Sequence, residues 1–148
     1  MNKLYSIVRE RETYSLNQNW TVLEAARYMA EKHIGAAAVL DGDRVVGVFS
    51  ERDLMTRVVV PGRPADQTRV AEVMTREIVV GSPEESYEDG LQRMQQAKCR
   101  HLPIVEDGRF LGFISLRDLL QVELQEKDEE LKHMNDYIHF VPPMGDNQ

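Results

Sequence analysis

Cysteine is nearly absent from this chain, which has a single one, Cys99, among 148 residues. One thiol excludes a disulfide within the chain and agrees with a reducing compartment. Long apolar runs are also missing, because no stretch approaches the roughly 20 residues that a membrane helix needs. The start of the chain, residues 1–5, lacks the apolar core of a signal peptide. The sequence therefore predicts a cytoplasmic protein that does not enter a membrane.

Basic residues are in the minority. Lys and Arg number 18 against 25 Asp and Glu, which gives a formal net charge of −7. A sequence-independent nucleic-acid binder normally has a basic surface, so this balance argues against nucleic acid as a partner. The acids are densest from 123 to 136, whereas Arg57, Arg100 and Arg109 are among the basic residues near two recurring motifs. That distribution favours a small anionic ligand over a polyanion.

The groups that usually mark an enzyme or a metal site are missing from the sequence as well. The four histidines show no metal-ligand spacing with nearby carboxylates. There is no phosphate-cradling glycine loop and no nucleophile paired with a base. We therefore expect no enzymatic activity and no bound metal. A nucleotide hydrolase that uses Asp53 or Asp118 as its base is the less favoured alternative.

What the chain has instead is one short motif made twice. Gly47-x-x-Ser50-x-x-Asp53 recurs 65 residues later as Gly112-x-x-Ser115-x-x-Asp118. Each copy follows a short apolar run and fits the end of a strand and the start of a helix, with Ser and Asp as a capping box. Taken alone, a capping box is a structural device.

An arginine in each motif indicates more than capping. Arg52 and Arg117 fall in the first helical turn, where the helix dipole disfavours a cation by about 0.3–1 kcal/mol, so we expect an anion nearby. A carboxylate can accept hydrogen bonds from two ribose hydroxyls, while a guanidinium and helix amides bind phosphate oxygens. A nucleotide combines a diol with a phosphate, and it suits this mixture of groups.

The duplication extends around the motif. With the same offset and no gaps, Thr21 matches Ser86, and Met29 matches Met94. Each unit reads as strand, helix, strand, strand, helix and is too small to be stable alone, so the two should pack face to face. We assign a lead-in to 1–12, the first repeat to 13–60, a linker to 61–76, the second repeat to 77–122 and a C-terminal helix to 123–141.

Turn and capping residues place the elements within these units. Thr21 with Glu24 predicts the start of a helix in the first repeat, and Ser86 with Asp89 does so in the second. Gly35 is the expected left-handed residue that ends the first of these helices. A further helix is predicted over about 51–59 and short strands over 13–16, 36–40, 45–49, 78–80, 102–105 and 110–114.

The tail, residues 120–141, is a candidate for one long helix. Leu124, Leu131 and Ile138 are seven residues apart, but Lys127 interrupts the neighbouring row. Two to three heptads fit either a helix that mediates dimerisation or one that folds back on its own domain. Both interpretations stay open at this point.

The chain strongly resembles a tandem pair of cystathionine-β-synthase (CBS) domains, often called a Bateman module. The resemblance rests on the two motifs, on the segment His101-Leu102-Pro103-Ile104-Val105 and on the turn Asp107-Gly108. The likeness covers about residues 13–120. It implies an α/β (α+β) fold in which two β-α-β-β-α repeats, related by a pseudo-twofold, enclose two clefts, with a C-terminal helix added. Similar modules bind AMP, ADP, ATP, S-adenosylmethionine or NAD(H) in those clefts and usually form a homodimer.

The resemblance also implies which residues contact the ligand. The Ser and Asp of each motif would contact phosphate and ribose, the backbone of the inner strand would meet adenine, and the opening strand of the opposite repeat would close each cleft. With the basic residues beside the motifs, the expected contacts are Ser50, Arg52, Asp53, Ala36, Ala37, Ala38, Ser115, Arg117, Asp118, Lys98, Arg100, His101, Leu102 and Pro103, with Thr13 and Tyr14 closing one cleft and Thr75 to Ile78 the other.

The repeats differ where phosphate would bind. The first has Ala36 where the second has His101, so its phosphate partners would be Arg52 and Arg57, and we expect the two clefts to differ in affinity or ligand.

The favoured function is a regulatory, energy-sensing module that binds an adenine nucleotide, with AMP preferred, and transmits its occupancy to a partner protein. The alternative is a dimeric interaction scaffold in which the motifs are only caps and the tail helix drives association.

Overall fold

The computed structural model describes residues 3–140, without the side chains of 137–140. The chain divides into two compact units, Met1–Leu116 and Arg117–Gln148, and each is described by itself. The first unit holds all the strands, and the second is helical over its described part. The fold is therefore α/β with two small sheets, as the sequence predicts.

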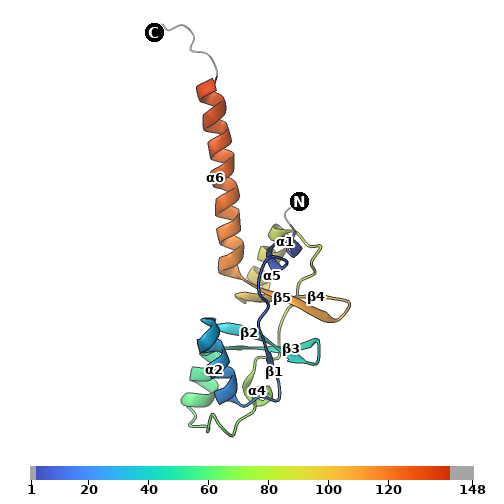
Figure 1. Ribbon diagram of the computed structural model, residues 1–148, viewed down its shortest axis with the longest axis vertical. Coiled ribbons are helices and arrows are strands. Elements are labelled where there is room, and N and C mark those ends of the chain that lie inside the picture. The colour runs from blue at the N-terminus through green and yellow to red at the C-terminus, as the bar shows by residue number, and fades with distance from the viewer. Residues whose placement is uncertain (1–2, 141–148) are drawn as a thin grey trace. The chain divides into compact units, whose positions relative to one another are not determined.

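The first repeat builds a three-stranded sheet in the order β1-β2-β3, from β1 (Ser15–Asn17), β2 (Ala36–Asp41) and β3 (Arg44–Ser50). β1 and β2 are parallel, so the chain must cross over between them, and helix α2 (Val22–Lys32) makes that connection. β2 and β3 form an antiparallel hairpin whose turn contains Gly42 at φ 66°, a left-handed conformation that glycine adopts without strain. Figure 1 shows α2 beside this sheet.

The core of the first repeat lies between α2 and the sheet. Val22, Ala25 and Met29 recur at helical spacing and are buried, together with Leu16 of β1 and Phe49 of β3. Full burial of a large apolar side chain contributes about 1.5–3 kcal/mol relative to exposure. This packing fixes the position of the end of β3 and of the residues that follow it, from Glu51 on.

A helix begins directly where β3 ends. α3 (Glu51–Asp53) is a single turn, and the chain continues without a break into η1 (Leu54–Val59), which has π-helical geometry. The two elements together confirm the helix predicted over about 51–59. The wide π turn itself is not predicted by the sequence, and such turns are frequently found at functional sites.

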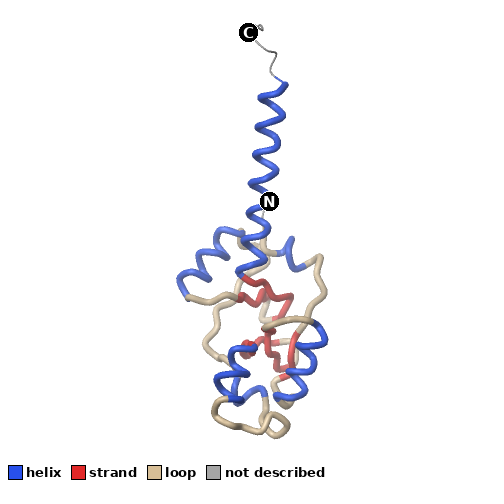
Figure 2. Tube along the Cα trace, turned by 90° about the vertical axis from the view of Figure 1, so that its left-hand side faces the viewer, coloured by secondary structure: helices blue, strands red, loops and turns tan. Residues whose placement is uncertain are grey.

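The second repeat forms the corresponding hairpin from β4 (His101–Glu106) and β5 (Arg109–Ser115), preceded by helix α5 (Tyr87–Ala97). Its hairpin has the same strand lengths as that of the first repeat, and both register shifts occur at equivalent positions. Figure 2 shows the strands of the two repeats close together. The Asp43 carbonyl accepts a hydrogen bond from the Phe110 amide at 2.9 Å, and the Asp43 carboxylate lies 3.2 Å from Arg109 Nε.

Two short helices, one in the lead-in and one in the linker, interlock the repeats. α1 (Tyr5–Val8) and α4 (Val70–Val73) are 65 residues apart, so the duplication includes them, which the sequence alone did not indicate. α1 precedes the first repeat but covers the second: a Cβ on Gly112 would lie 2.5 Å from Val8 Cγ1. α4 precedes the second repeat, and the residue after it, Met74, covers Gly47 of the first in the same way.

Three predicted positions are wrong. Gly35 does not end α2, because His33 takes the left-handed conformation two residues earlier, at φ 58°. Pairing with β2 begins only at Ser15, so the first strand covers 15–17 rather than 13–16. The strand predicted over 78–80 is not formed, because the Val80 carbonyl accepts a hydrogen bond from the Arg93 side chain at 2.8 Å instead of joining a ladder. Only an isolated parallel bridge from Gly81 pairs this segment with β4.

The second unit is made by helix α6 (Leu116–Phe140), which begins with the first turn after β5 and continues through the tail as one helix. This confirms the long helix predicted from Leu120. Its predicted end at Val141 and the side chain of Ile138 lie outside the described residues. Across residues 3–140, no helix combines the length and the apolar character that crossing a bilayer requires.

Candidate functional site

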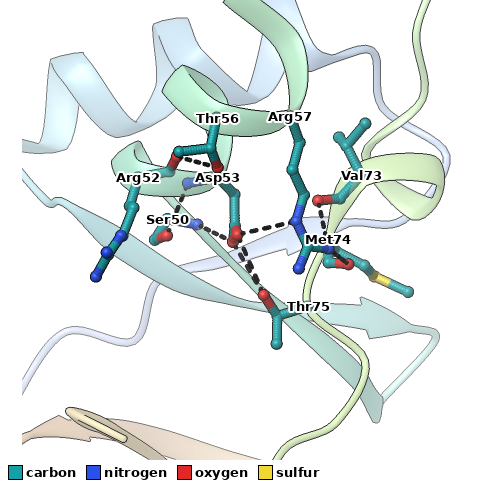
Figure 3. Close-up of polar contacts among 8 residues, drawn as sticks. All are labelled: Ser50, Arg52, Asp53, Thr56, Arg57, Val73, Met74 and Thr75. Atoms are coloured by element: carbon teal, nitrogen blue, oxygen red, sulfur yellow. Dashed lines mark hydrogen bonds and ion pairs between the residues drawn. The ribbon is translucent and has the colours of Figure 1, made fainter. Parts of the chain in front are cut away.

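Four polar side chains meet at the end of β3, and we call Ser50, Asp53, Arg57 and Thr75 the first corner (Figure 3). Ser50 caps the helix, since its Oγ accepts from the Asp53 amide at 3.1 Å. The Asp53 carboxylate returns the bond, accepting from the Ser50 amide at 3.0 Å. The capping box predicted from the sequence is therefore confirmed.

The Asp53 carboxylate does more than cap. Thr75 Oγ1 donates to its two oxygens at 3.2 and 3.3 Å, and Arg57 Nε lies 3.6 Å from Oδ1. Asp53 is only 8% exposed, which is rare for a carboxylate unless it is paired. An ionised carboxylate has about four acceptor positions and no donor. Every partner here is accordingly a donor, and the corner is built to hold negative charge.

Arg57 joins the corner to the segment that enters the second repeat. Its Nη1 donates to the carbonyl of Met74 at 3.0 Å and more weakly to that of Val73 at 3.5 Å, while its Nε faces Asp53. Arg57 lies in the π turn, and its side chain is 49% exposed. The spacing of Asp53 and Arg57 by four residues is a sequence signal for this ion pair. The link to the carbonyls depends on tertiary structure and has no such signal.

Thr75 is held in place by β3. Its amide and carbonyl exchange hydrogen bonds with Val48 at 2.8 and 2.9 Å. This close approach requires a residue without a side chain beside Val48, because a Cβ on Gly47 would lie 2.8 Å from the Thr75 carbonyl oxygen. The glycine that opens the motif therefore brings Thr75 to Asp53. Of the two segments predicted to close a cleft, the one that contains Thr75 is the one at the first corner.

The remaining residues predicted for the first cleft surround this corner to different degrees. Ala36, Ala37 and Ala38 are buried in β2, and Ala36 pairs with Ser50 across the hairpin. Arg52 is exposed, and in Figure 3 its side chain extends on the other side of Asp53 from Arg57. Ile78 is half-buried, three residues beyond Thr75.

Thr13 and Tyr14, the other pair predicted to close a cleft, lie just before β1. Thr13 is exposed. The Tyr14 ring packs edge-on against Tyr28 of α2 at 6.4 Å, and its hydroxyl donates to the Glu12 carboxylate at 2.5 Å. That hydrogen bond raises the pKa of the Tyr14 hydroxyl above its ordinary value of 10.0. The described contacts of Tyr14 are therefore with Glu12 of the lead-in and with α2 of the first repeat.

We call the end of β5 at Ser115, with the start of β4 at His101 that pairs with it, the second corner. Ser115 ends β5 opposite His101, whose ring stacks on Phe113 at 5.2 Å, and the Leu116 amide donates to the Arg100 carbonyl at 2.7 Å. Leu102 and Pro103 are buried in β4, whereas Lys98 and Arg100 are exposed. Arg117 and Asp118 belong to the second unit, where they lie in the first turn of α6.

Side chains that could share a metal ion do not gather in the described part of the chain: no group of three or more His, Cys, Asp and Glu is placed to hold one. The charged groups of the first corner instead pair one carboxylate with one guanidinium and two hydroxyls. That set suits an organic ligand with hydroxyls and an anionic group.

Comparison with known proteins identifies the fold and the duplication. The family model of the CBS domain matches residues 7–60 and 70–124. CBSX3, a mitochondrial CBS domain-containing protein of Arabidopsis thaliana, is 30% identical over 123 residues, which are 80% of this chain and 60% of CBSX3. The chain thus spans less than two thirds of that relative.

Solved structures agree with this assignment. A putative signal-transduction protein with CBS domains from Burkholderia ambifaria is 33% identical, with a TM-score of 0.75 over 83% of this chain and 94% of that one. A CBS domain protein from Pyrobaculum aerophilum, solved in complex with AMP, has the same fold at 23% identity, with a TM-score of 0.70 over 78% of this chain and 88% of that one. This chain belongs to the CBS domain family and carries the domain twice.

Proposed function

We propose that the first corner binds an adenine nucleotide, with AMP as the preferred ligand, and that binding regulates a partner protein. The Asp53 carboxylate accepts hydrogen bonds from the two ribose hydroxyls, and Ser50 and Arg57 hold the phosphate. The inner strand at Ala36–Ala38 lies beside the corner, where the adenine base would meet its backbone.

The observation that carries this proposal is the pattern of distances around Asp53. The capping bonds at 3.0 and 3.1 Å have ordinary lengths. The contacts from Thr75 at 3.2 and 3.3 Å and from Arg57 at 3.6 Å are long for charged partners, which prefer about 2.5–2.9 Å. Two hydroxyls of a ribose could therefore replace the long contacts at little cost while the cap stays intact.

The comparisons support the ligand class. The Pyrobaculum aerophilum protein, which shares the fold, binds AMP. Its identity to this chain is low, so it supports the fold's capacity for such a ligand and not the particular contacts. The family and the first corner together favour a nucleotide-binding regulatory module. We propose a binding role without catalysis, and unchanged nucleotide after long incubation with a divalent metal is the expected result.

The test is calorimetric titration of the full chain with AMP, ADP, ATP, NAD(H) and S-adenosylmethionine. Asp53→Asn keeps the shape and one capping acceptor but removes the charge, so binding should weaken by about 1.5–3 kcal/mol, roughly ten- to a hundredfold. Asp118→Asn makes the same change of charge in the second motif.

Glu24→Gln is the matched control. Glu24 also caps a helix, accepting from the Thr21 amide at 2.9 Å, and it also loses its charge in this variant. If Asp53 acts only as a cap, the two variants should change stability to a similar extent and neither should change ligand binding. Equal nucleotide affinity in Asp53→Asn and Glu24→Gln would therefore contradict the proposal and favour the scaffold interpretation.

We also propose that the chain forms a homodimer through η1 and the residue after it. Three large apolar side chains are exposed on this short segment: Met55 by 54%, Val59 by 65% and Val60 by 75%. A second copy of the chain would cover them, and single substitutions at these positions test that. Val59→Glu is expected to convert a dimer to a monomer in sedimentation measurements. Deletion of 121–148 should leave the dimer intact, and loss of the dimer in that deletion alone would assign self-association to the tail helix.

A further inference from the structure

An apolar stripe runs along α6 and is open to solvent. Leu120, Leu124, Leu131 and Met134 are 46%, 63%, 57% and 60% exposed, and their spacings of four, seven and three residues place them on one face. The stripe covers about 21 Å of the helix, at 1.5 Å per residue. Figure 1 shows α6 as one uninterrupted helix. Large apolar residues in such a row usually mark a contact surface.

The charged residues that flank the stripe are all acidic. In the heptad that places Leu124 and Leu131 at the first core position, Glu123 and Glu130 lie on one side of the stripe and Asp128 on the other. Lys127 occupies the remaining core position between them and is exposed. The stripe therefore consists of large apolar side chains with one lysine, Lys127, at a core position, and acidic residues lie on both sides of it.

This pattern disfavours pairing with a second copy. In a parallel pair, flanking residues contact those of the other helix, so Glu123 would face Asp128 of the other copy. In an antiparallel pair, Glu123 would face Glu130, and Asp128 would face itself. Two Lys127 ammonium groups would also come close in the parallel arrangement. Like charges at these positions destabilise a helix pair.

We infer that α6 is a docking face for a helix of a different protein, one with an apolar row, Lys or Arg along both flanks, and an Asp or Glu opposite Lys127. The charges on α6 from Glu123 to Glu130 are complementary to that helix, and the helix-in-groove type of recognition uses such apolar anchors. The family match ends at residue 124, so most of the stripe lies beyond the part of the chain shared with other CBS domains.

The test uses the full chain and two synthetic helical peptides of about 20 residues, which span the stripe. The first has Leu at the core positions, Lys at the flanks and one Glu placed to face Lys127. The second is identical except that its flanks are Glu. Fluorescence anisotropy should show binding of the basic peptide, weaker at high salt because exposed charges are screened, and no binding of the acidic one.

Variants locate the contact. Leu124→Asp with Leu131→Asp should weaken binding of the basic peptide at least about tenfold, equivalent to about 1.4 kcal/mol. Glu123→Lys with Glu130→Lys should reverse the preference between the peptides. Glu126→Lys with Glu129→Lys makes the same charge change on α6 away from the flanks and should leave the preference unchanged. Circular dichroism confirms that α6 stays helical in each variant, and urea unfolding compared with the wild type confirms that the first unit is intact.

Several results would overturn the inference. These are equal binding of both peptides, binding of neither, and equal behaviour of the flanking and control charge variants. A dimer of the wild-type chain that Leu124→Asp with Leu131→Asp dissolves would show instead that a second copy covers the stripe.

Discussion

The hairpins β2-β3 and β4-β5 are near copies, whereas the groups that surround them differ. Strand lengths, register shifts and the left-handed residue that ends the preceding helix are the same in both repeats. The first repeat adds a third strand, β1, where the second has only the bridge at Gly81. The duplication therefore preserves the scaffold that presents each corner and varies what completes it.

The same contrast applies at the corners. With the offset of 65, Thr75 and Arg57 correspond to Glu10 and Val122. The threonine hydroxyl and the arginine guanidinium that face Asp53 are thus not repeated at these two positions, and the second repeat has basic residues on the approach to β4. Equal motifs do not imply equal sites, and we expect the two corners to differ in their affinity for a nucleotide.

The largest expected effect is the loss of stability when a core side chain is truncated in either repeat. Phe49 and Ile114 are equivalent residues of β3 and β5, and both are fully buried. Phe49→Ala should cost about 3–5 kcal/mol and Ile114→Ala about 2–5 kcal/mol, through lost burial and the cavity left behind. Urea unfolding measures both. Because α1 and α4 interlock the repeats, each variant should shift one common unfolding transition. Two separate unfolding transitions would contradict that interlocking.

The interlocking is tested more finely at the hairpin glycines. Gly112→Ala places a Cβ 2.5 Å from Val8 Cγ1, and Gly47→Ala places one 2.8 Å from the Thr75 carbonyl oxygen, so each should cost about 1–3 kcal/mol. Val8→Ala should relieve the first clash in part, because it removes Cγ1 and leaves the Val8 Cβ at 2.9 Å. Met74→Ala should relieve the second far less, because backbone remains. A double-mutant cycle without coupling between 8 and 112 would contradict the packing of α1 on the second repeat.

Helix capping should give smaller differences. Thr21→Ala and Ser86→Ala each remove a side chain that accepts from a backbone amide at 3.1 Å, and each should cost about 1 kcal/mol. The Thr21 box is complete, because Glu24 accepts from the Thr21 amide, whereas α5 has only the serine half. Glu24→Gln should therefore lower the melting temperature more than Asp89→Asn, and the reverse order would contradict this assignment.

The smallest expected effect is on pH dependence. The Thr21 amide holds the pKa of Glu24 below its ordinary 4.5, and the Arg69 amide does the same for Glu72. Since the folded pKa is the lower one, the stability that these carboxylates provide is present above pH 4.5 and is lost as pH falls through their folded pKa values. Melting temperatures measured across this range should fall less steeply in Glu24→Gln than in the wild type.

The sequence predicted the features that depend on neighbouring residues. The capping boxes at Thr21 and Ser50 follow from residue spacing, and so do the hairpins and the duplicated motif. The π turn in η1 could not be predicted, because its hydrogen bonds depend on how the helix packs. The link from Arg57 to the Met74 carbonyl joins segments 17 residues apart. The apolar run at 78–80 has the sequence pattern of a strand. The Val80 carbonyl, however, accepts a hydrogen bond from the distant Arg93 side chain and not from a neighbouring strand, and the sequence pattern carries no sign of that contact.

The most direct test of the account is a crystal structure of the chain with AMP. We expect both ribose hydroxyls within hydrogen-bond distance of the Asp53 carboxylate, the capping bonds to Ser50 retained, and the Arg57 guanidinium turned from Asp53 towards the phosphate. A first corner in which Asp53 keeps Thr75 and Arg57 as its partners, with AMP absent or bound elsewhere, would contradict nucleotide binding by Asp53.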